Sequence, residues 1–108
     1  MSATPASELA AAAALAFAKP FGGLIRLEAD AAPPLWIDGR QSPPAITEAS
    51  PVDAGAAPLC VWRAAQDTLL RICQGERLLG SAYVSGRLSI AGDMSIMARL
   101  QLERGTRG

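Results

Sequence analysis

DTLLRICQGERLLGSAYVSGRLSIAGDMSIMARLQLE, from Asp67 to Glu103, is the stretch that decides the fold. Glycines at positions 75, 86 and 92 divide it, and each segment between them has an apolar face. Glycine readily adopts the positive φ at which helices end and chains turn. The pattern therefore predicts a helix, a short second apolar element, a strand and a closing helix, in that order.

The segments can be placed more closely. A helix is expected over about 65–74, with Leu69, Leu70 and Cys73 on one face. Residues 78–84 form an apolar turn or short helix, and the alternation over 87–91 predicts a strand. Asp93 is expected to cap the last helix, because an Asp carboxylate accepts hydrogen bonds from the first free N–H groups. The apolar stripe of that helix is expected to comprise Met94, Met97 and Leu100, with Ile96 beside it.

The first half of the chain predicts one helix and several strands. A helix is expected from Thr4-Pro5 to about Lys19, with Leu9, Ala13 and Phe17 on one face. That face points either to the core or, in a second interpretation, to a membrane as part of a lid.

Strands are expected over 24–29 and 35–38, paired as an antiparallel hairpin across a turn at 30–34. Prolines flank a short third strand over 46–49, which places it at a sheet edge. Residues 59–63, LCVWR, are apolar on both faces and predict a strand covered on both sides. We expect one domain over 1–108 with a frayed tail at 104–108. Its fold class is α/β (α+β), with a mixed, mostly antiparallel sheet and helices on one face.

Charge and composition exclude several classes of function. The 108 residues carry 10 basic and 10 acidic side chains, so no strong field attracts nucleic acid, and we expect no nucleic-acid partner. Residues 1–59 have a net charge of −3 and residues 60–108 of +3. That asymmetry indicates either a face that docks on an anionic membrane or a mixed, solvated surface. No apolar run is long enough to span a bilayer and no signal peptide is evident, so we expect a soluble, cytoplasmic protein with free Cys60 and Cys73.

No catalytic or metal site is predicted, and no cofactor. The chain has no His, the commonest general base and metal ligand, and no Cys-x-x-Cys pair. Its glycine-containing turns lack the Gly-Lys-Ser/Thr ending of a phosphate loop. Asp38 and Asp93 could form an acid–base pair, but the Asp38-Gly39 turn and the helix cap explain them better. We therefore expect a protein that is not an enzyme.

Taken together, residues 65–103 resemble the sterol carrier protein type 2 domain family. The resemblance rests on the order and spacing of a set of residues rather than on one motif. The set comprises Asp67, Leu70, Gly75, Ala82, Gly86-Arg87-Leu88, Gly92-Asp93, Met94, Met97 and Leu100. The first half fits more loosely, and the proline-rich stretch over 43–58 departs from the family pattern.

The resemblance implies a five-stranded sheet with helices on one side enclosing an apolar cavity. It also implies binding, and possibly transfer, of a sterol, fatty acyl chain, phospholipid or isoprenoid, with transient membrane contact, as a monomer or weak dimer. The alternative is an accessory or scaffold protein of the same fold that assists a lipid or quinone biosynthetic complex. The candidate lipid-contacting residues are Phe17, Leu69, Cys73, Leu79, Tyr83, Met94, Met97 and Leu100.

Overall fold

The computed structural model describes residues 5–29, 33–51, 55 and 57–100. The helices are α1 (Pro5–Ala16), α2 (Gln66–Cys73), α3 (Leu79–Val84) and α4 (Ser95–Arg99). The strands are β1 (Leu24–Ala29), β2 (Leu35–Asp38), β3 (Ala45–Thr47), β4 (Leu59–Ala64) and β5 (Leu88–Gly92). The expected cap at Thr4, part of the turn at 30–34, and the tail at 104–108 lie outside the described residues.

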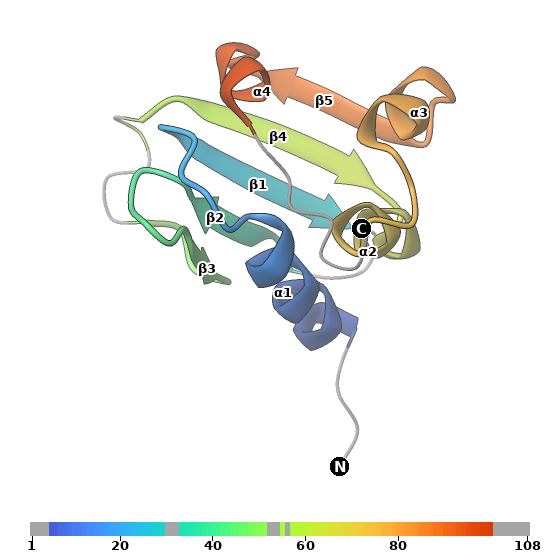
Figure 1. The fold of residues 1–108 in the computed structure, drawn as a ribbon, viewed down its shortest axis with the longest axis horizontal. Helices are drawn as coiled ribbons and strands as arrows, with labels where there is room; N and C mark the ends of the chain where they lie inside the picture. The colour runs from blue at the N-terminus through green and yellow to red at the C-terminus, as the bar shows by residue number, and fades with distance from the viewer. Residues whose placement is uncertain (1–4, 30–32, 52–54, 56, 101–108) are drawn as a thin grey trace.

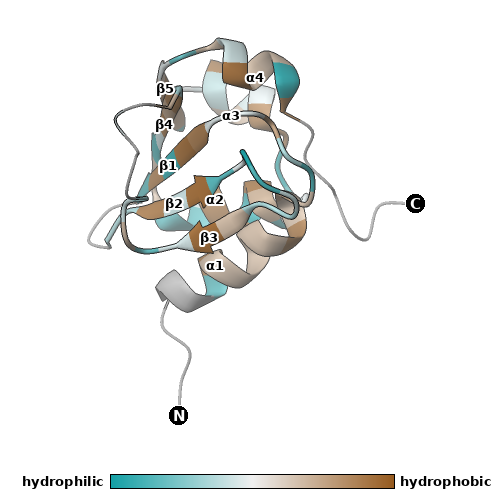
Figure 2. Ribbon diagram, turned by 90° about the vertical axis from the view of Figure 1, so that its left-hand side faces the viewer, coloured by the Kyte–Doolittle hydropathy of each residue, from teal (hydrophilic) through white to brown (hydrophobic). Residues whose placement is uncertain are grey.

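The strands form one sheet in the order β3-β2-β1-β4-β5. β1 and β4 pair in parallel, and the other three pairings are antiparallel, which confirms the mixed, mostly antiparallel sheet. The register aligns Ile25 with Ile37 on one side and with Cys60 on the other. These side chains belong to one buried core cluster. α1 and α2 cover one face of the sheet (Figures 1 and 2). The core lies between that face and the helices.

Glycine ends two helices as the sequence predicts. Gly75 has φ 79° and Gly86 has φ 81°. After α2, the N–H of Gly75 bonds to the carbonyl of Ile72 and that of Glu76 to Arg71. The same two-bond pattern follows α3, and it is the Schellman arrangement that a left-handed glycine permits.

The first helix is three residues shorter than expected, ending at Ala16 rather than Lys19. A proline ring clashes with the carbonyl four residues earlier, and Pro20 stands four residues after Ala16. The N–H of Phe17 still donates to Ala13 over 2.8 Å, so the aromatic ring keeps its helical direction. Leu9, Ala13 and Phe17 are all buried, which confirms the core-directed face.

Two strand predictions need correction. The third strand covers Ala45–Thr47 instead of 46–49, because Thr47 Oγ1 donates to the Ala49 carbonyl over 2.8 Å and the chain turns there. β4 is not covered on both sides. Cys60 and Trp62 are buried under the helices, whereas Val61 on the opposite face is only half-buried.

The apolar stripe predicted for the last helix is wrong at Met94, whereas Met97 and Leu100 pack against the core as predicted. α4 has five residues, and its buried side chain is Ile96, not Met94. The N-cap residue is Met94 rather than the predicted Asp93, but Asp93 lies one residue earlier and its Oδ1 accepts from the Ser95 backbone N–H over 3.0 Å and from the Ser95 hydroxyl over 2.6 Å. That turn sets the phase of the helix and directs Ile96 against Gly23.

Candidate functional site

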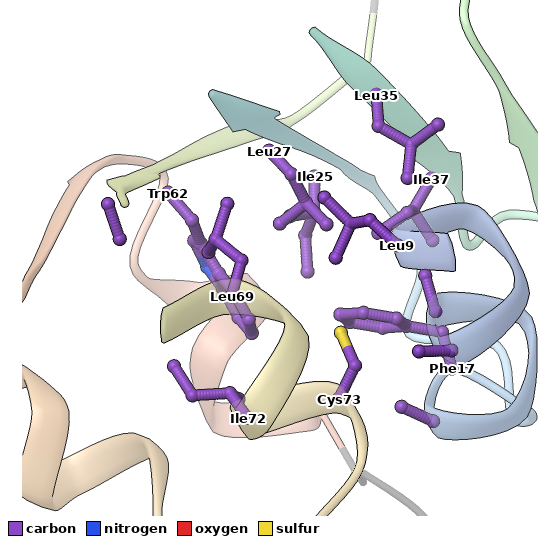
Figure 3. Close-up of a cluster of buried hydrophobic side chains, with 14 of the residues drawn as sticks. Leu9, Phe17, Ile25, Leu27, Leu35, Ile37, Trp62, Leu69, Ile72 and Cys73 are labelled. Carbon is purple, nitrogen blue, oxygen red and sulfur yellow. The ribbon is translucent and has the colours of Figure 1, made fainter. Parts of the chain in front are cut away.

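The candidate site is the apolar layer between α1, α2 and the sheet (Figure 3). β1 and β2 contribute Ile25, Leu27 and Ile37, which point toward the helices because alternate strand residues share one face. α1 contributes mainly small side chains. The buried residues of this helix are Leu9, Ala12, Ala13 and Ala16.

Three of the candidate residues meet inside this layer. Phe17, Leu69 and Cys73 are each at most 4% exposed. Figure 3 shows the Cys73 sulfur directed at the Phe17 ring. That ring lies 5.6 Å from the ring of Trp62 and 6.1 Å from Phe21, so the aromatic groups form a continuous tilted stack.

The other five candidates lie at the margin or outside. Leu79, Met97 and Leu100 are partly buried against the core. Tyr83 is 50% exposed and Met94 is 48% exposed, so the structure does not bring these two side chains into the layer. Leu100 follows α4 rather than belonging to it. Ile72 and Ile96, which are not among the candidates predicted from the sequence, are buried in the layer instead.

The two thiols of the layer, Cys60 and Cys73, have low reactivity. Burial raises the pKa of Cys73 to about 12 and also raises the pKa of Cys60. Both cysteines are free, as the sequence predicts. A thiol with a raised pKa carries little thiolate at neutral pH and is a poor nucleophile. These side chains therefore serve as apolar packing.

Trp62 is the unusual member of the layer. Its side chain is fully buried, yet the indole Nε1–H has no hydrogen-bond partner within the described part of the chain. The Cys60 sulfur, two residues earlier on the same face, is a weak acceptor beside this N–H: the indole lowers the pKa of the thiol, against the larger effect of burial, but the pair does not reach full hydrogen-bond geometry. A buried N–H without a partner costs about 1–3 kcal/mol. The sequence places Trp62 on a strand face with Cys60, but this missing partner depends on the packing around it.

The acidic side chains considered for catalysis are held apart. Four residues lie opposite one another on successive strands of the sheet, in the order Asp38, Leu24, Leu59 and Asp93. Three strand spacings separate the backbones of Asp38 and Asp93 by about 14 Å. Hydrogen bonds from Arg40 lower the pKa of Asp38 to about 2, and those from Ser95 lower the pKa of Asp93. Each carboxylate thus has a local structural partner.

Three further observations concern metal sites, membrane-spanning helices and a second pocket. Among the described residues, no group of three or more His, Cys, Asp or Glu side chains could hold a metal ion. No described helix is long and apolar enough to cross a membrane. An open pocket of about 270 Å³ lies beside β2 and β3, and its lining includes Asp38, Gln41 and Thr47. By strand alternation, Asp38 and Thr47 belong to the face turned away from the helices, so this pocket is separate from the apolar layer.

Comparisons with known proteins give a consistent result at the level of the fold. No protein-family model matches the sequence, and no curated protein matches it. Among solved structures, sterol carrier protein 2 of Yarrowia lipolytica in its apo form superposes with a TM-score of 0.58 at 14% identity, covering 75% of this chain and 70% of that one. The sterol carrier protein domain 2 of Helicoverpa armigera gives 0.56 at 14% identity, over 73% and 63% of the two chains.

Sterol carrier protein 2 like 2 of Aedes aegypti also gives 0.56, at 16% identity, over 84% of this chain and 83% of that one. These likenesses cover both halves of the chain, including the half in which the sequence resemblance is loose. The chain therefore has the sterol carrier protein 2 fold.

Proposed function

We propose that this chain binds a hydrophobic lipid in the apolar layer between α1, α2 and the sheet, without catalysing a reaction and without a cofactor. One observation carries the proposal. In this sterol-carrier-like fold, no charged side chain is buried among the described residues, and Thr68 is the one buried polar residue among them. An apolar interior of that kind suits a ligand that contributes hydrocarbon and little else.

The small side chains of α1 support entry of an acyl chain. Ala12, Ala13 and Ala16 are buried on the helix face that packs on α2 and β3. A helix that presents methyl groups needs only a modest outward shift to admit a hydrocarbon chain. Each methylene moved from water into such a layer contributes about 0.8 kcal/mol, so ten contribute about 8 kcal/mol before the costs of association. That gross term is sufficient for useful affinity.

The unpartnered indole of Trp62 narrows the class of lipid. Its buried N–H can donate to a carbonyl, ester or hydroxyl oxygen but not to a pure hydrocarbon. A ligand that places such an oxygen beside Trp62 would recover the cost of the missing hydrogen bond. We therefore favour a fatty acyl lipid or sterol over an alkane.

Two matched substitutions on α1 test the proposal. Ala13 is fully buried and Ala14 is exposed on the same helix. Ala13→Leu adds bulk inside the layer, whereas Ala14→Leu makes the same chemical change on the outer surface. The affinity for a fluorescent fatty acid is expected to be at least tenfold lower for Ala13→Leu and unchanged for Ala14→Leu. Equal binding by both variants would remove α1 from the site.

Because overpacking a core costs about 1–3 kcal/mol, thermal melts of both variants are needed beside the titrations. A folded Ala13→Leu protein that has lost binding supports a site in this layer. Absence of binding in the unmodified protein, with every lipid tested, would favour the accessory or scaffold role instead. In that case the layer acts as an ordinary core.

Transfer goes one step beyond binding and requires transient contact with a membrane. Movement of a labelled lipid between donor and acceptor vesicles measures it directly. In this proposal the protein acts in the cytoplasm, where thiols such as Cys60 and Cys73 stay reduced. A rate of vesicle exchange unchanged by the protein would limit its role to storage or presentation.

A further inference from the structure

The two edges of the sheet differ in how they are protected. β3 at one edge has three residues and follows Pro43 and Pro44, and both features discourage pairing with another strand. β5 at the other edge has five residues, LSIAG, without charge or proline. Natural sheets usually block such an edge, because its free N–H and carbonyl groups can template a further strand.

The register shows which groups of β5 face outward. The Asp93 N–H donates to the Leu59 carbonyl over 2.8 Å, so Asp93 and Leu59 form a hydrogen-bonded pair of the antiparallel ladder. Alternation then directs the backbone groups of Ser89 and Ala91 toward β4. Those of Leu88, Ile90 and Gly92 point to the free edge of the sheet.

We propose that two copies of this chain join through their β5 edges, antiparallel and centred on Ile90. A two-fold axis at Ile90 pairs that residue with its own copy and pairs Leu88 with Gly92 of the partner subunit. These are the residues at the free edge, so the Ile90 pair forms hydrogen bonds in the normal antiparallel manner, while the Leu88–Gly92 pairs lie at the strand ends, where Gly92 has φ 105°. The two sheets become one continuous sheet.

Charges at the ends of β5 select this register. Arg87 immediately precedes the strand and Asp93 immediately follows it, each three residues from Ile90. The two-fold axis therefore sets Arg87 opposite Asp93 of the partner subunit, and the same pair forms again at the other end. The Arg87 side chain has no ion-pair or hydrogen-bond partner in the described ranges, and Asp93 uses Oδ1 alone for its hydrogen bonds with Ser95, with the Arg99 guanidinium close enough to help lower the Asp93 pKa. Both charges are thus available to a second copy.

The segments that flank β5 also carry most of the large apolar side chains that are exposed in the described part of the chain. Five large apolar side chains are exposed in the described part of the chain, and one of them, Leu15, lies on α1. The other four lie just before β5 or just after it, in and around α3 and α4, which stand at opposite ends of the strand (Figure 1). They are Leu78, Tyr83, Val84 and Met94. Pairing about Ile90 brings α3 of each copy toward α4 of the other, where these side chains can be covered.

Charge reversal tests the interface and its register together. Sedimentation equilibrium of the full chain is expected to show association toward twice the monomer mass of 11.2 kDa as concentration rises. Arg87→Asp and Asp93→Arg each place like charges opposite one another and are expected to sediment as monomers. An equimolar mixture of the two variants restores opposite charges at both ends and is expected to associate again. Glu48→Arg, an exposed change near the β3 edge, serves as the matched control and leaves association unchanged.

Amide exchange provides a readout that does not depend on the variants folding. The N–H groups of Ser89 and Ala91 are expected to be protected at every concentration because they face β4. Protection of Leu88 and Ile90 is expected to rise with concentration, as their N–H groups become paired. A chain that remains a monomer up to its solubility limit would overturn the proposal. So would association that persists in both charge variants, or concentration-independent exchange at Ile90.

Discussion

Gly39 supports the aromatic stack, and replacing it with alanine tests how tightly that stack is built. A Cβ at position 39 would lie 2.4–2.5 Å from three atoms of the Phe21 ring, well inside van der Waals contact. The backbone of Gly39 is fixed by hydrogen bonds on both sides. Its carbonyl accepts from Phe21 and Gly22, and its N–H donates to Gly23. The backbone at Gly39 therefore cannot shift away from the added Cβ contact, and the Phe21 ring must move instead.

The size of the effect follows from these contacts. Phe21 is 3% exposed and its ring lies 6.1 Å from that of Phe17, so displacing it disturbs the candidate site. Overpacking of this kind costs about 1–3 kcal/mol. For a domain of this size, about 2 kcal/mol lowers the melting temperature by roughly 10 °C. We expect Gly39→Ala to show that loss, with a changed fluorescence from Trp62, which touches Phe17.

Gly80→Ala serves as a control, because this substitution is expected to raise the melting temperature instead of lowering it. Gly80 lies within α3, and nothing stands within 4 Å of a Cβ at this position. Alanine in a helix is about 0.5–1 kcal/mol more favourable than glycine, so this variant is expected to melt at a higher temperature. Calorimetry of both proteins measures the pair. A melting temperature for Gly39→Ala equal to that of the unmodified protein would refute the contact between Gly39 and Phe21.

Three further predictions concern ionisation, thiols and the buried indole. Arg40 lowers the pKa of Asp38 from 3.8 to about 2. The ionised carboxylate therefore adds about 1 kcal/mol, after solvent screening, to the free energy of unfolding. This stabilisation is present above pH 4 and is lost as pH falls toward 2. Urea unfolding of Asp38→Asn should therefore show a lower stability than the unmodified protein at pH 7, and this deficit should be largely lost at pH 2, where about half of Asp38 is protonated. A disulfide reagent should label Cys60 and Cys73 slowly in the folded protein and fast in urea, and rapid labelling of the folded state would contradict their burial. Trp62→Phe should weaken binding of a fatty acid more than that of an alkane of equal length, and an equal loss for both would exclude a hydrogen bond from the indole.

Local signals in the sequence were sufficient to predict much of the fold. Gly75 and Gly86 end helices because only glycine takes their positive φ easily, and this requirement is visible without any tertiary information. Prolines likewise indicate the edge position of β3. Asp93 lies one residue before the N-cap rather than at it, yet its carboxylate still accepts the first hydrogen bonds at the start of the last helix.

Features that depend on packing were harder to predict. α4 has only five residues, too few for a periodic pattern to fix its phase, and the turn at Asp93 directs Ile96 inward in place of Met94. The one-sided burial of β4 depends on all the helices packing on the same face of the sheet. The missing partner of Trp62 depends on which side chains surround it. No pattern within the sequence reports that environment.

Native mass spectrometry of protein purified without detergent tests the central proposal most directly. If the apolar layer holds a lipid, a species heavier than the 11.2 kDa chain by the mass of one lipid should appear. The extra mass should be lost in Ala13→Leu and kept in Ala14→Leu. A bare chain in every preparation, together with no saturable uptake of added fatty acid or sterol, would contradict lipid binding by this protein.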